Sequence, residues 1–132
     1  MRFPIALAAL IVLAVQAPTH AVSAPQISDL VGNWTGTSLC QVRPSPCHDE
    51  DVIFRFSKPQ GDKITVQADK LVDGKAVTMG VSEWTYERSS GTLTWQTPRG
   101  TWKLVVEGDA MNGTLVVPEN VLFRKVHLKR SK

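Results

Sequence analysis

The amino-acid sequence predicts an all-β protein, an antiparallel up-and-down (meander) β-barrel of about eight to ten strands. Beyond residue 30, apolar and polar residues alternate with a period of two, and no window favours an amphipathic helix. The alternating segments are short and are separated by tight turns, which is the pattern of an antiparallel meander. A long meander has two unpaired edges, and closing the first strand onto the last removes them.

The alternation predicts nine short strands. They are residues 33–40, 51–56, 63–70, 75–79, 82–88, 92–97, 101–107, 110–117 and 121–129. Asp73-Gly74 is the strongest hairpin signal, and a break near Gly80 separates the fourth segment from the fifth. The segments form one predicted domain, residues 30–132, which is large enough for a modest core.

The first 29 residues lie outside this predicted domain. Arg2 and the apolar run 5–15 are typical of a signal peptide, residues 1–21, with cleavage expected after Ala21. The run is shorter than the ~20 residues of a membrane span. Residues 22–29 are then a flexible leader. The mature protein is expected to be secreted or periplasmic, without a membrane span.

The two cysteines, Cys40 and Cys47, predict a disulfide in an exported chain. The six residues between them include two prolines, and such a loop can return to the ~5.5 Å Cα spacing of a disulfide. The alternative is a metal site that also uses His48. Zinc sites usually have four ligands and shorter cysteine spacing, so no metal is expected.

Two segments of the sequence resemble those of a known protein family. Gly32-Asn33-Trp34 resembles the Gly-x-Trp of lipocalins, and residues 123–128 resemble the closing strand of lipocalin-like (calycin) barrels, which often carries an arginine. The chain also resembles bacterial secreted lipocalin-like proteins in its Ser-Pro-Cys-His-Asp-Glu loop, residues 45–50. The resemblance implies that Arg124 packs structurally across Trp34 at the closed end. In some fatty-acid binders this arginine instead faces a ligand carboxylate.

Strand parity predicts which side chains face the interior. Facing Arg124 outward would bury Lys125, His127 and Lys129, which costs more than burying one arginine. The expected inward aromatic residues are Trp34, Phe54, Phe56, Trp84, Tyr86, Trp95 and Trp102. The predicted ligand-binding residues are Phe54, Trp84, Tyr86, Trp95, Trp102 and Arg124, around a small apolar ligand. The alternative is a barrel that its own side chains fill.

Other classes of function have little support in the sequence. No nucleotide-binding, serine-hydrolase or zinc-protease motif occurs, and paired cysteines cannot act as nucleophiles. We therefore expect that the protein is not an enzyme and has no catalytic residues and no cofactor. The basic C-terminal end lacks the interleaved aromatics of a nucleic-acid surface. Residues 48–51, His-Asp-Glu-Asp, lack the spacing of a calcium loop.

The first functional hypothesis is therefore an exported, non-enzymatic, lipocalin-like binder of a small apolar ligand. The alternative is a protein-interaction module, such as a secreted protease inhibitor, that binds an extracellular partner through the disulfide loop 41–50.

Overall fold

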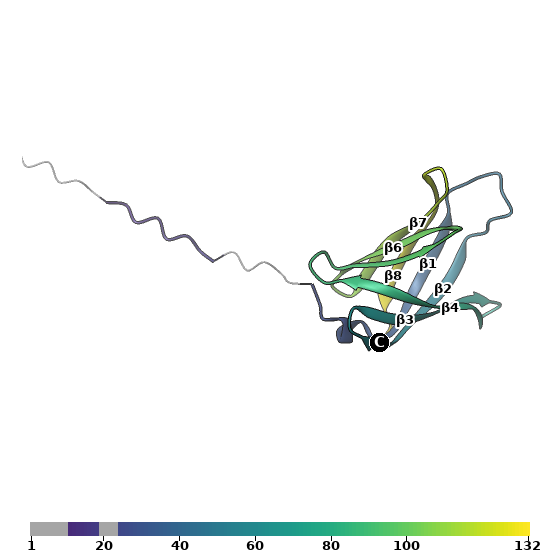
Figure 1. Ribbon diagram of the computed structural model, residues 1–132, viewed down its shortest axis with the longest axis horizontal. Coiled ribbons are helices and arrows are strands. Elements are labelled where there is room, and N and C mark those ends of the chain that lie inside the picture. The colour runs from purple at the N-terminus through teal and green to yellow at the C-terminus, as the bar shows by residue number, and fades with distance from the viewer. Residues whose placement is uncertain (1–10, 19–23) are drawn as a thin grey trace, which may run out of the picture.

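The computed structural model describes residues 11–18 and 24–132. A short 3-10 helix, η1 (Ile27–Leu30), precedes eight antiparallel strands that close into an up-and-down barrel in chain order (Figure 1). The strands are β1 (Gly32–Cys40), β2 (Glu50–Gln60), β3 (Lys63–Val72), β4 (Lys75–Glu87), β5 (Thr92–Thr97), β6 (Gly100–Glu107), β7 (Ala110–Val117) and β8 (Val121–Arg130). The predicted fold class is confirmed.

The predicted signal peptide falls mostly outside the described residues, and so does its cleavage site at Ala21. Of residues 1–21, the structure describes 11–18, an exposed stretch without regular secondary structure that lies apart from the barrel in Figure 1.

The expected break near Gly80 is wrong, because one long strand, β4, replaces the two predicted segments. Gly80 pairs with Ala68 on β3, whereas the next pair joins Asp69 to Thr78, so Met79 is an extra residue on β4. This is a β-bulge, which bends a strand without ending it. The glycine that suggests a break therefore lies beside a bulge within a continuous strand.

The outward-facing carboxylate of Asp69 lies at this bulge and is almost completely buried, with a relative exposure of 2%. It accepts hydrogen bonds from Arg55 Nε at 2.8 Å, Thr78 Oγ1 at 2.9 Å and Gln67 Nε2 at 3.1 Å. Burial acts to raise the pKa of Asp69, but these hydrogen bonds and the charge of Arg55 outweigh burial, so the pKa lies below its ordinary value. The network fixes the outer surface of the barrel where the register shifts.

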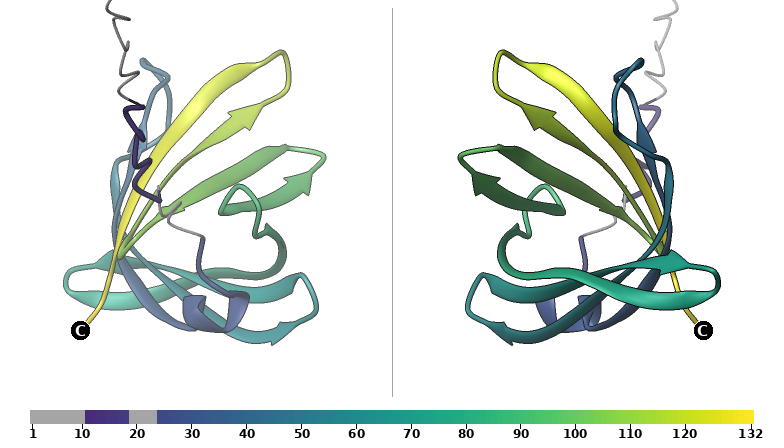
Figure 2. Two further views of the ribbon diagram at one scale, coloured as in Figure 1. Left: turned by 90° about the vertical axis from the view of Figure 1, so that its left-hand side faces the viewer. Right: turned by 90° about the vertical axis from the view of Figure 1, so that its right-hand side faces the viewer.

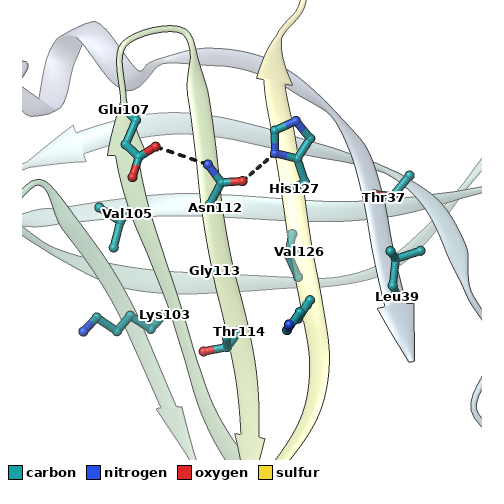
Figure 3. A pocket seen from close by; sticks show the side chains of 11 residues that line it. Thr37, Leu39, Lys103, Val105, Glu107, Asn112, Gly113, Thr114, Val126 and His127 are labelled. Carbon is teal, nitrogen blue, oxygen red and sulfur yellow. Dashed lines mark hydrogen bonds between the residues drawn. The ribbon is translucent and has the colours of Figure 1, made fainter. Parts of the chain in front are cut away.

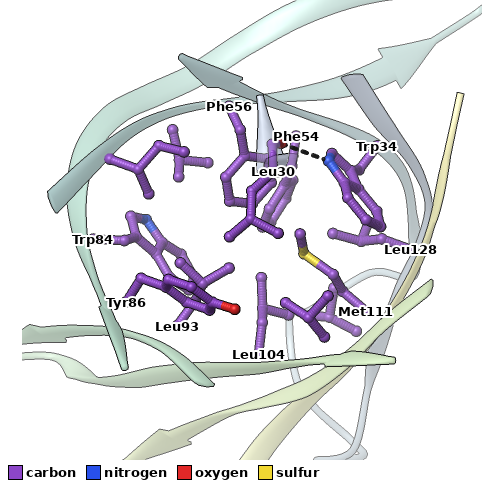
Figure 4. Close-up of a cluster of buried hydrophobic side chains, with 14 of the residues drawn as sticks. Leu30, Trp34, Phe54, Phe56, Trp84, Tyr86, Leu93, Leu104, Met111 and Leu128 are labelled. Atoms are coloured by element: carbon purple, nitrogen blue, oxygen red, sulfur yellow. Dashed lines mark hydrogen bonds between the residues drawn. The ribbon is translucent and has the colours of Figure 1, made fainter. Parts of the chain in front are cut away.

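The core fills the end of the barrel that η1 covers, where Ile27 packs against it. Figure 4 shows the largest side chains of this cluster. Leu30 at the end of η1 is fully buried among side chains from the strands. The largest of these are Trp34, Phe54, Phe56, Trp84, Tyr86, Leu93, Leu104, Met111 and Leu128. The period-two alternation correctly predicts these inward positions because one face of each strand lies toward the interior.

Two glycines let the backbones of neighbouring strands approach closely. A Cβ atom on Gly36 of β1 would lie 1.8 Å from the carbonyl oxygen of His127, and one on Gly113 of β7 would lie 1.9 Å from that of Lys103. Neither position can therefore hold a side chain without moving the neighbouring strand. Glycines of this kind mark close backbone approaches in tightly curved sheets.

An arginine does pack across Trp34, but it is Arg130 rather than the expected Arg124. The Arg130 guanidinium lies 4.3 Å from the centre of the Trp34 ring, and its Nη2 donates to the carbonyl of Asp29 at 2.6 Å. Trp34 Nε1 donates to the carbonyl of Leu30 at 3.0 Å. The correction follows from antiparallel register, which places Trp34 opposite Arg130 at the end of β8 and leaves Arg124 opposite Cys40.

The described part of the expected flexible leader, residues 24–29, contacts the closed end of the barrel. The Tyr86 hydroxyl donates to the carbonyl of Pro25 at 2.7 Å, and Arg88 Nε donates to that of Ala24 at 3.3 Å. Residues 24–26 and η1 thus cover this end together.

The seam between β4 and β5 is much shorter than the others. Across the described barrel these strands pair only at Thr85–Thr94, Tyr86–Leu93 and Glu87–Thr92, whereas every other neighbouring pair of strands shares at least six paired positions. Beyond Thr85 and Thr94 the two strands diverge (Figure 2). The open end of the barrel widens on this side.

Candidate ligand-binding site

A row of inward side chains crosses the open end of the barrel. The register places Trp95 of β5 opposite Trp102 of β6, Trp102 opposite Leu115 of β7, and Leu115 opposite Arg124 of β8. Trp84 of β4 extends the row, with its ring centroid 6.0 Å from that of Trp95 and 6.4 Å from that of Trp102. We call Trp84, Trp95 and Trp102 the tryptophan row.

The tryptophan row lines an internal cavity of about 240 Å³. Five of the six predicted ligand-binding residues line it: Phe54, Trp84, Trp95, Trp102 and Arg124. The wall also includes Val52, Val66, Ala68, Met79, Gly80 and Ser82, together with Ser38 and Glu50. The interior is therefore filled at the closed end and hollow at the open end.

Tyr86, the sixth predicted residue, does not line this cavity. It lies two residues beyond Trp84 on β4, so its side chain is displaced toward the closed end and its hydroxyl bonds to Pro25. Burial raises the pKa of the Tyr86 hydroxyl. The structure thus makes Tyr86 an anchor for the leader rather than a polar group of the cavity.

Arg124 lies at the rim of the cavity, with its side chain only 13% exposed. Its Nη1 donates to the carbonyl and hydroxyl oxygens of Ser38, both at 3.3 Å, and to the carbonyl of His48 at 3.1 Å. Glu50 Oε2 lies 3.9 Å away, within ion-pair range but too far for a hydrogen bond. Arg124 therefore connects β8 to β1 and to the loop that follows it.

Ser38 and Glu50 are polar residues of the cavity that the predicted site does not include. Ser38 has the same strand parity as Trp34, so its inward direction was readable from the alternation. The placement of Glu50 beside Arg124 depends on the path of the 41–50 loop, for which the sequence carries no periodic signal.

A second hollow of about 450 Å³ adjoins the cavity at the mouth of the barrel. Its lining is Trp95, Thr97, Pro98, Arg99, Trp102 and Leu115. We call it the mouth hollow. Since Trp95 and Trp102 line both spaces, the cavity and the mouth hollow are neighbours across these two indoles.

A larger hollow of about 610 Å³ lies on the outer face of β6, β7, β8 and β1 (Figure 3). Glu107, Asn112 and His127 form a chain of hydrogen bonds along one side of it, and Lys103 lies toward its other end. Ligand sites are usually concave spaces that enclose most of the ligand. The internal cavity meets that criterion better than this open groove on the barrel surface.

The predicted disulfide is confirmed. Cys40 and Cys47 are bonded, with their Cα atoms 6.0 Å apart. Asp49 Oδ1 accepts hydrogen bonds from the backbone N–H of Cys40 at 2.8 Å and from Arg43 Nη2 at 2.9 Å. The bond uses both thiols of the alternative metal site, and the described residues contain no group of three side chains that could hold a metal.

Comparisons with protein-family models and with curated protein sequences find no match to this chain. Within residues 11–18 and 24–132, no helix is long and apolar enough to cross a membrane.

Proposed function

We propose that this protein is an exported, lipocalin-like, non-enzymatic barrel that binds a small apolar molecule in its internal cavity. The observation that carries the proposal is the tryptophan row, which together with Phe54 gives the cavity a wall of four aromatic side chains. Pockets for small molecules are typically lined by apolar and aromatic side chains with a few polar groups. Here the polar groups gather at the rim, where Arg124, Glu50 and Ser38 lie.

Export is the second part of the proposal. A disulfide persists in oxidising compartments and is rare in the cytosol, and the N-terminal sequence has the charge and apolar run of a signal peptide. N-terminal sequencing of the protein from the producing cells should give Val22 as the first residue. An intact Met1 in material from outside the cytoplasm would contradict cleavage.

Gly80 provides a direct test of the cavity. It lines the cavity wall, and a Cβ atom placed on it would have no atom within 4 Å, so a larger side chain there has room to enter the cavity. We expect Gly80→Leu to fold and to bind apolar ligands at least ~10-fold more weakly, which corresponds to about 1.4 kcal/mol. The matched control is Val81→Leu, because Val81 is 64% exposed on the outer side of the same strand.

The measurement is titration with N-phenyl-1-naphthylamine, a neutral aromatic probe, followed by tryptophan quenching and probe emission. Wild type and Val81→Leu should bind equally, and Gly80→Leu should lose binding. If a panel of apolar and aromatic probes leaves emission and Tm unchanged, or if Gly80→Leu binds as well as the control, the cavity is not the binding site.

The 41–50 loop supports a second candidate function, inhibition of a secreted protease. The disulfide and the Arg43–Asp49 ion pair hold this loop, while both side chains of the pair remain more than half exposed. A loop held in one conformation loses little entropy on binding a partner. Residual activity of secreted proteases should fall on mixing with the protein, and should recover when the disulfide is reduced. Full protease activity with wild type would exclude this candidate.

A further inference from the structure

The mouth hollow and the internal cavity together form a site in two parts, and the internal cavity alone is small. Its volume of about 240 Å³ lies below the ~300–1,000 Å³ of ordinary ligand pockets. A ligand of ordinary size must therefore extend beyond it. The neighbouring space that shares two indoles with the cavity is the mouth hollow.

The shared wall favours a flat aromatic ligand. Trp84 lies 6.0 Å and 6.4 Å from its two neighbours in the row, at interplanar angles of 33° and 50°. Aromatic rings interact at centroid distances of 4.5–7 Å, and such contacts add about 0.5–1.5 kcal/mol to the burial of apolar area. Trp95 and Trp102 are only half-buried, so they have surface left to cover.

The charges at the mouth favour an acidic group on that ligand. Arg99, in the turn between β5 and β6, lines the mouth hollow, and none of the described residues that line this hollow carries a carboxylate. Within the described chain, the Arg99 guanidinium has no hydrogen-bond or ion-pair partner. Arg124, on the other side of the rim, already bonds to Ser38 and His48 and faces Glu50.

We propose that the mouth hollow is the acid-binding half of a two-part site: the ligand is a planar aromatic acid whose ring system enters the cavity against the tryptophan row and whose anionic group faces Arg99. This inference rests on the proposed function, because it assigns a ligand class to the same cavity. It adds Arg99, Pro98 and Leu115 to the binding residues.

Two probes with one aromatic skeleton separate the two halves of the site. 8-Anilinonaphthalene-1-sulfonate carries a sulfonate, whereas N-phenyl-1-naphthylamine has the same rings without a charge. Replacing Arg99 by Glu turns an attraction for the sulfonate into a repulsion at an exposed site. We therefore expect R99E to weaken binding of the sulfonate about three- to tenfold and to leave the neutral probe unchanged.

The matched control is Lys125→Glu, which makes the same charge change on β8 next to Arg124 but on the outer face of the barrel. It should leave the affinity for both probes as in wild type. Salt should reduce the difference between the two probes in wild type, because exposed charges are screened.

The outcomes separate this inference from the proposed function. Suppose that both probes bind wild type, that Gly80→Leu binds neither, and that R99E and K125E have the same affinity for the sulfonate. The cavity then binds ligand, but the acid-binding half of the site is refuted. If Arg124→Gln weakens the sulfonate while R99E does not, the acidic group lies across the mouth and the assignment to Arg99 is wrong. If neither probe binds wild type, the proposed function fails with it.

Discussion

Removing the carboxylate of Asp69 should destabilise the barrel more than its outward direction suggests. In Asp69→Ala, Arg55, Gln67 and Thr78 lose their shared acceptor. A hydrogen bond to a charged group contributes about 1.5–3 kcal/mol. Arg55 is partly exposed and recovers hydration in the variant, so the three lost bonds are not additive. We expect a loss of about 2–3 kcal/mol in the free energy of unfolding.

That loss should appear as a fall of Tm by about 8–12 °C, at about 4 °C per kcal/mol for a domain of this size. The assay is thermal and urea unfolding at neutral pH, followed by circular dichroism. Asp51→Ala is the control, because Asp51 is exposed and a surface change of this kind costs within about 0.5 kcal/mol. A Tm for Asp69→Ala within 2 °C of that control would refute the account of the network; this threshold corresponds to about 0.5 kcal/mol.

The contribution of Asp69 to the free energy of unfolding should depend on pH. Because the folded-state pKa of Asp69 is lowered, its ionised form stabilises the fold above the ordinary pKa of 3.8. That stabilisation is lost as the pH falls through the lower folded-state pKa. The stability difference between wild type and Asp69→Ala should thus be constant from neutral pH to about pH 5 and should shrink below about pH 4. A difference that shrinks between pH 7 and 5 would contradict the lowered pKa.

Three further predictions concern the fold. Replacing both cysteines by alanine should cost about 2–3 kcal/mol, since the closed loop spans a separation of seven residues, and a urea midpoint equal to wild type would contradict this. Gly36→Ala should cost at least ~3 kcal/mol or prevent folding, because its methyl group would overlap a carbonyl oxygen, and an unchanged Tm would disprove the close approach. Arg130→Leu should shift the NMR resonance of the Trp34 indole N–H whereas Arg124→Leu should not, and the reverse result would restore the Arg124–Trp34 pairing that the family resemblance implies.

The alternation of apolar residues predicted most of the interior because it depends only on strand geometry. Trp34, Phe54, Phe56 and Trp84 are all buried, as their parity indicates. The sequence does not predict that β4 is continuous, because a glycine within an alternating segment can indicate the end of a strand. Whether the strand ends or forms a bulge near Gly80 depends on its pairing with β3, and the local sequence does not indicate that pairing.

The pairing between strands that are distant in the sequence is the second feature that the sequence does not predict. Parity places Arg124 on the inward side, where the structure finds it at the cavity rim, but parity says nothing about its partner. That partner follows from the register of β1 against β8, which moves Arg130 onto Trp34. Tyr86 shows that parity also leaves the position along a strand open: its parity matches that of Trp84, yet its side chain lies on the closed-end side of Trp84 and bonds to Pro25.

The short seam between β4 and β5 has a consequence for how the barrel moves. The backbone bonds between these strands stop just before Trp84 and Trp95, so on this side of the open end the wall is joined by indole packing rather than by a hydrogen-bonded ladder. Local opening requires least free energy where few backbone bonds must break. Amide protons along this seam should therefore exchange faster than those of β2 and β3. A ligand that bridges the two indoles would close the seam as it binds, so occupancy of the cavity and rigidity of the wall would rise together.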